Sequence, residues 1–198
     1  AIKRGVMLAG GLPIEFPIIS MHESFSNPTS MFLRNLMAMD AEEMIRAQPM
    51  DSVVLIGGCD KTVPALLMAA ASADVPAILT VTGPMSTSKY KGQRLGACTD
   101  CRRFWGQHRA GEIDAEEINE IGDKLAPGPG TCMVMGTAST MALTSEAMGM
   151  MLPGAASIPA VHADRLRNAE ATGARAVEIG HEQLRPSDIM TPAAFRNA

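Results

Sequence analysis

The chain has few aromatic residues and no long hydrophobic run. Aromatic side chains make up 4% of its 198 residues, with a single Trp and a single Tyr, whereas Met accounts for 16. Charged residues, Gly or Pro interrupt every apolar stretch before it reaches the roughly 18–20 residues of a membrane-spanning helix. We therefore expect a protein that does not cross a membrane and whose core is filled by Met and Ala side chains.

A basic patch is also missing. Seventeen Lys and Arg residues stand against 21 Asp and Glu residues, and no more than two basic residues are adjacent. A nucleic-acid-binding protein normally gathers its basic residues on one face or along one helix. Nucleic acid is therefore not an expected partner, and the composition is that of an ordinary folded globular protein.

The N-terminus has neither a starting Met nor the apolar segment of a signal peptide. The missing Met is compatible with a sequence that lacks its natural beginning. Four Cys residues without secretory features are typical of cytosolic thiols or metal ligands rather than of a disulfide framework. We therefore expect a cytoplasmic protein.

Two apolar runs separated by an Ala-rich segment predict the fold. Residues 52–56 form a continuous apolar run of the kind that is buried on both faces of a parallel sheet. Residues 64–73 favour a helix, and residues 75–81 form a second β-branched run. The order strand, turn, helix, strand predicts an α/β fold, a parallel β-sheet flanked by helices.

Shorter signals predict the remaining elements. A Pro-flanked, β-favouring stretch at residues 14–21 predicts a short or edge strand. Residues 83–96, rich in Gly, Ser and Lys, predict a long loop. Capping residues and apolar spacing predict the helices. Three of them start at Asn27-Pro28, at Asp40 and at Thr191-Pro192, and three more cover residues 114–125, 137–151 and 164–180.

The turn after the first buried run is the candidate site. Ligands of open α/β sheets bind at the carboxyl ends of the strands, where this turn places Cys59, Asp60 and Lys61. An acid and a base in a glycine turn are costly to bury without partners, so we expect them to meet a metal or a substrate. A phosphate-binding loop is excluded because Asp60 stands where a Gly must precede the Lys.

Two further residues offer ligands. Cys132, like Cys59, stands in a Gly-flanked turn before a predicted helix, where backbone N–H groups and the helix dipole stabilise a thiolate. Both are candidate soft-metal ligands, and the alternative for each is a small buried hydrophobe. Glu23 follows the first predicted strand and could join Asp60 around a hard cation such as Mg²⁺, or it is a solvated loop acid.

Cys98 and Cys101 form a CxxC pair in or beside the long loop. A zinc ribbon needs a second such pair, and a thioredoxin-type motif begins a helix directly after a strand. We therefore expect two reduced thiols, with a zinc-binding module on this pair as the alternative.

Two segments closely resemble the signatures of a known family. Residues 57–65 (GGCDKTVPA) and 130–141 (GTCMVMGTASTM) are similar to the two signature segments of the dihydroxy-acid dehydratase and 6-phosphogluconate dehydratase family. Shorter similarities extend along the chain, at residues 15–17, 34–40, 152–154, 158–161 and 186–191. Residues 27–29 and 34–36 resemble the sugar-acid branch, which includes arabinonate-type pentonate dehydratases, more than the branched-chain amino-acid branch.

The resemblance implies a hydro-lyase that dehydrates a sugar acid, an aldonate, to a 2-keto-3-deoxy acid. Cys59 and Cys132 would be two of three thiolates around an iron–sulfur cluster, [2Fe–2S] in the sugar-acid enzymes or else [4Fe–4S]. Glu23, Asp60 and a carbamylated, catalytic Lys61 would hold Mg²⁺. The full-length protein would be a homo-oligomer, a dimer or a tetramer.

Members of the family are much longer than this chain. We therefore expect residues 1–198 to be a single α/β cluster-binding domain, truncated at both ends, without the first cluster Cys and the C-terminal domain, and inactive alone. Two alternatives remain open: a dihydroxy-acid dehydratase of branched-chain amino-acid synthesis, and a non-catalytic α/β fragment.

Overall fold

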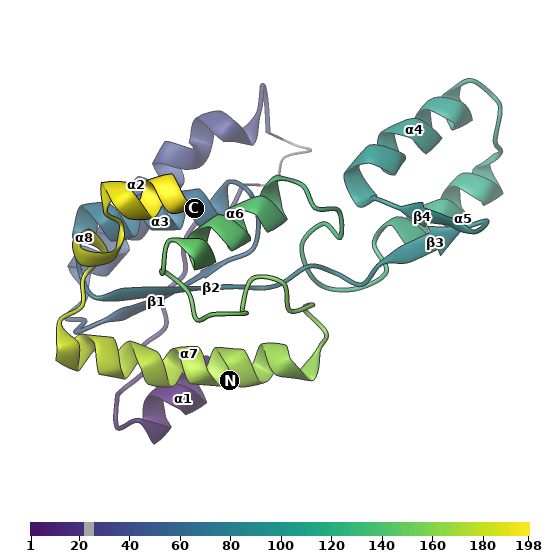
Figure 1. Ribbon diagram of the computed structural model, residues 1–198. Helices are drawn as coiled ribbons and strands as arrows, with labels where there is room; N and C mark the ends of the chain where they lie inside the picture. The colour runs from purple at the N-terminus through teal and green to yellow at the C-terminus, as the bar shows by residue number, and fades with distance from the viewer. Residues whose placement is uncertain (22–25) are drawn as a thin grey trace.

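The structure, a computed structural model, describes residues 1–21 and 26–198, apart from the side chain of Cys98. Figure 1 shows a larger α/β part and a smaller lobe that projects from it. None of the helices in the described ranges is long and apolar enough to cross a membrane.

A parallel pair of strands lies at the centre of the larger part. β1 (Val53–Gly57) pairs with β2 (Ala77–Val81) over their whole length, and α3 (Thr62–Ala73) connects them. Parallel strands require such a crossover, which is commonly a helix. The α/β fold predicted from the two apolar runs is therefore confirmed.

Helices cover both faces of this pair (Figure 1). On one face α3 packs against α2 (Arg34–Ala47) and α6 (Thr137–Ala147), and on the other lies α7 (Ala163–Glu182), with α1 (Ile2–Leu8) against it. The main core contains many Ala residues and three buried Met residues, as the composition predicted.

Two glycines allow α1 and α7 to approach closely. A Cβ on Gly5 would lie 1.9 Å from the carbonyl oxygen of Glu170, and one on Gly173 would lie 2.2 Å from that of Ile2. Only the absence of both side chains permits this backbone contact. The crossing helps to fix α1 beside the sheet.

The lobe has a core of its own. It consists of an antiparallel hairpin of β3 (Ser88–Tyr90) and β4 (Gln93–Leu95), followed by α4 (Ala97–Arg109) and α5 (Ala115–Leu125). Its buried residues form a cluster separate from the main core: Tyr90, Leu95, Phe104, Ile118, Ile121 and Leu125.

The predicted long loop at residues 83–96 is partly wrong, because its second half is this hairpin. Lys91 and Gly92 adopt positive φ angles of 45° and 81°, which fit the two central positions of a tight hairpin turn. Burial of Tyr90 and Leu95 in the lobe core then holds the two short strands together. The sequence pattern did not predict α4.

The N-terminal predictions also need correction. Residues 14–21 form no strand; they run as irregular chain, from which Phe16 and Ile18 pack against the main core. A 3₁₀ turn (Ser30–Leu33) that is capped by Thr29, rather than by Asn27, leads directly into α2. Asp40 starts no second helix, because it lies inside α2 and its carboxylate accepts a hydrogen bond from the Ile19 amide (2.8 Å).

The remaining helices follow the predictions closely. Asp114 caps α5 by accepting a hydrogen bond from the Glu117 amide (2.8 Å), and Thr191 caps α9 (Pro192–Asn197) in the same way. α6 ends at Ala147 rather than at residue 151, and α8 (Pro186–Ile189) is an additional short helix.

Candidate functional site

The turn after β1 carries three of the predicted site residues. Cys59, Asp60 and Lys61 lie between the end of β1 and the beginning of α3. The carbonyl of Cys59 accepts a hydrogen bond from the Val63 amide (3.0 Å), so the turn continues directly into the helix. The three side chains therefore stand at the carboxyl end of a parallel strand, as predicted.

Asp60 is the centre of the local hydrogen-bond network. Its Oδ2 accepts hydrogen bonds from the hydroxyl of Thr137 (2.7 Å) and from Nζ of Lys61 (3.1 Å), and its Oδ1 accepts one from the thiol of Cys59 (3.2 Å). Thr137 is the first residue of α6, so this carboxylate joins the β1 turn to the start of a distant helix. No sequence pattern predicted a role for Thr137, although it lies within the second signature segment.

The network sets the protonation of its members. Burial alone would raise the pKa of Asp60, but the hydrogen bonds from Thr137, Cys59 and Lys61 outweigh it and lower that pKa. Burial, together with the neighbouring Asp60, raises the pKa of the Cys59 thiol. This shift favours the protonated thiol in the metal-free protein, whereas a coordinated metal ion favours the thiolate.

Cys132 lies in a neighbouring turn at the same end of the sheet. The residue before it, Thr131, forms a parallel bridge with the segment that follows β2. A Cβ on Gly58 would lie 3.9 Å from the Cγ2 of Thr131. Because Cys59 and Cys132 each follow one of these two contacting residues, the fold brings the two thiol-bearing turns together.

The CxxC pair lies in the lobe. Cys98 and Cys101 belong to the first two turns of α4, not to a loop, and Cys101 packs against the lobe core as a free thiol. The amide of Ala97 at the start of α4 contacts Sδ of Met133 (3.4 Å). The lobe therefore touches the Cys132 turn through Met133.

Glu23, the third predicted Mg²⁺ ligand, lies outside the described residues. In the parts of the chain that the structure does describe, no three Cys, His, Asp or Glu side chains gather to hold a metal ion. Of the predicted ligands, Cys59 and Asp60 are in contact, Lys61 joins them through Asp60, and Cys132 stands in the adjacent turn.

The fold and the site together define a class of protein. Thiols suit soft metals and carboxylates suit hard cations, and here both stand where α/β proteins bind ligands. All 198 residues match the family model described as "Dihydroxy-acid/6-phosphogluconate dehydratase N-terminal". The chain belongs to this family, as its two signature segments indicated.

Curated relatives are similar over essentially the whole chain. It is 49% identical to L-arabonate dehydratase of Azospirillum brasilense, 47% to L-arabinonate dehydratase of Rhizobium leguminosarum bv. trifolii and 44% to 6-deoxy-6-sulfo-D-gluconate dehydratase of Pseudomonas putida, with 100% of this chain covered in each. Relatives named dihydroxy-acid dehydratase match at 38–41% identity. The chain spans about a third (34%) of the length of the three sugar-acid relatives.

Proposed function

We propose that this chain is the cofactor-binding part of a hydro-lyase that converts an aldonate into a 2-keto-3-deoxy acid. The observation that supports the proposal is the closeness of Gly58 to Thr131, where a Cβ on Gly58 would lie 3.9 Å from Cγ2 of Thr131, because Cys59 and Cys132 directly follow these two residues. The sugar-acid names of the more similar relatives favour an aldonate over a branched-chain dihydroxy acid.

The thiols and carboxylates of this chain are the kinds of ligand that an iron–sulfur cluster and a hard cation require. Cys59 and Cys132 would supply thiolates to the cluster, with a third ligand from outside this chain, and Asp60 and Glu23 would supply carboxylate oxygens to Mg²⁺. Lys61 as an ammonium would oppose a cation, since its Nζ lies 3.1 Å from Asp60. Carbamylation replaces that positive charge with an anionic oxygen ligand, which is why we include Lys61 in the site.

The chemistry explains why the site needs both kinds of ligand. Dehydration of a 2,3-dihydroxy acid removes a weakly acidic proton from the α-carbon and expels hydroxide, which is a poor leaving group. When bound, the two metal centres supply Lewis acids for the substrate carboxylate and for its departing hydroxyl.

The side chains of this chain orient the site. The Thr137 hydroxyl and the Lys61 amine hold one oxygen of Asp60, while the Cys59 thiol contacts the other. The carboxylate is thus fixed and ionised before a cation arrives, which reduces the reorganisation that binding requires. The product enol would then tautomerise to the keto acid without a redox change.

The test uses the full-length protein that contains this chain, reconstituted anaerobically with iron, sulfide and Mg²⁺. We expect 2-keto acid from an aldonate such as L-arabinonate or D-xylonate, and little from a branched dihydroxy acid. Cys59→Ser and Cys132→Ser should each lose cluster absorbance and at least about tenfold in kcat, the size expected when a metal ligand or its support is lost.

Cys101→Ser is the matched control. Cys101 lies in the lobe, so this substitution should leave the cluster absorbance and kcat unchanged. Turnover of the branched acid alone would assign the chain to branched-chain amino-acid synthesis. Absence of any keto acid from the whole panel would refute the hydro-lyase proposal.

A further inference from the structure

A buried arginine near the start of α7 has no acidic partner in the described part of the chain. Arg165 is 7% exposed, and its Nη2 donates hydrogen bonds to the carbonyls of Ala155 (2.8 Å) and Ile158. Its Nε and Nη1 have no hydrogen-bond partner among the described residues. Burial of a guanidinium without a counter-charge costs free energy. We therefore look for a role of Arg165 in the two carbonyl contacts that it makes, since it forms no ion pair with the described residues.

The two carbonyls belong to the connection between α6 and α7. Glu146 of α6 holds its middle, because its carboxylate accepts hydrogen bonds from the amides of Gly154 and Ala156, both at 2.7 Å. Arg165 of α7 holds the same stretch at Ala155 and continues to Ile158. The connection is therefore held from both helices.

This connection supports the segment that follows β2. The amide of Ala160 donates to the carbonyl of Pro84 (2.9 Å). A Cβ on Gly83 would lie 2.3 Å from the carbonyl oxygen of Ile158 and 2.8 Å from Nη2 of Arg165. Only a glycine lets these groups come so close, and its φ of 86° is one that other residues rarely adopt.

The segment after β2 in turn holds the second cysteine turn. The Thr131 amide donates to the Gly83 carbonyl, and the Met85 amide donates to the Thr131 carbonyl, both at 2.9 Å. Three chain segments are thus hydrogen-bonded in series: the α6–α7 connection, residues 83–85, and the turn that carries Cys132.

We infer that Arg165 is a positioning residue for Cys132, which it holds in place through Ile158, Gly83 and Thr131. The inference rests on the proposed function, because that proposal makes Cys132 a cluster ligand. The contacts themselves are those of the metal-free protein. One guanidinium nitrogen, Nη2, bonds both carbonyls, and the rigid planar group fixes the position of that nitrogen. The ammonium of a Lys also has several donors, but it sits on a more flexible stem and is held less firmly.

The test compares Arg165→Ala and Arg165→Lys with the unmodified protein in metal-free form. Amide hydrogen exchange at Thr131 and Met85, and the rate at which iodoacetamide alkylates Cys132, are followed by mass spectrometry. We expect both rates to rise about tenfold in Arg165→Ala through local opening, with Arg165→Lys in between. Alkylation of Cys101, in the lobe, should not change.

Arg175→Ala is the matched control, since this arginine of α7 pairs only with Glu178 and Glu182 of the same helix among the described residues. Equal acceleration in the control, or no acceleration at Thr131 and Cys132 in Arg165→Ala, would overturn the inference. If Arg165→Ala does not fold, Arg165→Lys carries the test, and exchange at Thr131 and alkylation of Cys132 must then be faster in it than in the unmodified protein.

These readouts separate the two proposals. A protein that fails to dehydrate any acid but shows the expected change at Cys132 refutes the proposed function and leaves the role of Arg165 standing. An active dehydratase with unchanged Cys132 reactivity in the Arg165 variants refutes only the positioning role.

Discussion

One oxygen of Asp60 accepts hydrogen bonds from a residue of its own turn and from a residue 77 positions away along the chain. Its side chain is 21% exposed, so these bonds are only partly screened by water. This carboxylate joins the β1 turn to α6, and the proposed function uses it also as an oxygen ligand. Its neighbours, rather than its own identity, make it suited to both.

Replacement of Thr137 by Val tests this joint. The change removes the hydroxyl donor while keeping the shape of the side chain, and we expect the free energy of unfolding of the metal-free protein to fall by about 1 kcal/mol. Denaturant unfolding measures the difference. Thr140→Val is the control, because among the described residues the Thr140 hydroxyl bonds only the backbone carbonyl of Gly136. An equal loss in both variants would contradict a specific role for the Asp60 contact.

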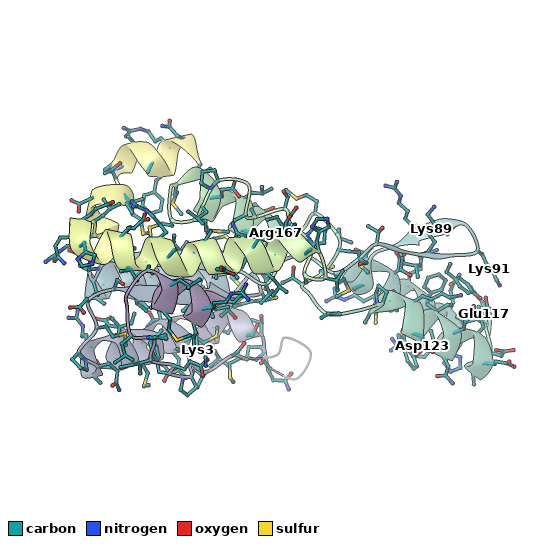
Figure 2. All side chains as sticks on the ribbon, turned by 90° about the horizontal axis from the view of Figure 1, so that it is seen from below. Lys3, Lys89, Lys91, Glu117, Asp123 and Arg167 are labelled. Atoms are coloured by element: carbon teal, nitrogen blue, oxygen red, sulfur yellow. The ribbon has the colours of Figure 1, made fainter. Side chains whose placement is uncertain are left out.

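At the scale of elements, the lobe is tied together by charge as well as by its core. Figure 2 shows Lys91 and Glu117 side by side at the end of the lobe, where the carboxylate accepts hydrogen bonds from the Lys91 amine (2.7 Å) and the Tyr90 hydroxyl (2.8 Å). The group joins the β3–β4 hairpin to α5. These hydrogen bonds, the one from Lys91 first, lower the pKa of Glu117.

This lowered pKa predicts that the lobe loses stability in acid. A carboxylate whose pKa is lower in the folded state contributes stability above its unfolded pKa, and the contribution disappears as the pH falls through the folded value. The protection factors of the α5 amides, each taken relative to the intrinsic exchange rate at the same pH, should therefore fall from neutral to acidic pH. Glu117→Gln should be less stable at neutral pH, and its stability should depend less on pH. If the pH dependence is the same in this variant, it comes from other titratable groups.

At the scale of the whole molecule, two separate cores imply two units of stability. The main core and the lobe core share no residue, and Figure 1 shows the lobe projecting from the sheet-bearing part. Stability in proteins is often divided among such contiguous units. The lobe meets the segment after Cys132 at Met133, and a Cβ on Gly96 would lie 2.4 Å from Cγ2 of Val134.

Ile121→Ala tests this division. Ile121 is fully buried in the lobe core, and truncation of a buried Ile to Ala typically costs about 2–5 kcal/mol. We expect faster amide exchange throughout α4 and α5, with β1 and β2 unchanged. Ile121→Val, which typically costs about 0.5–1.5 kcal/mol, should give a graded version of the same pattern. Equal acceleration in β1 and β2 would show a single cooperative unit instead.

The amino-acid sequence by itself determined the local parts of this protein. The apolar runs and the Ala-rich segment specify β1, α3 and β2, and the Asp114 and Thr191 caps specify helix starts, because each signal acts between residues that are close along the chain. The same holds for the donor atoms at residues 59, 60 and 132, two thiols and a carboxylate, since donor chemistry belongs to the side chain. Thr29 and the Lys91-Gly92 turn were missed because their effect depends on what packs around them.

Only the tertiary structure decided which distant groups meet. The closeness of Gly58 to Thr131, the bond from Thr137 to Asp60 and the close approach of Arg165 to Gly83 all involve residues that no local pattern connects. They follow from how the helices pack on the two strands, and a hydrogen bond between remote segments forms only when that packing has fixed both partners. For this reason the chemistry of the site was readable in the sequence, while its assembly was not.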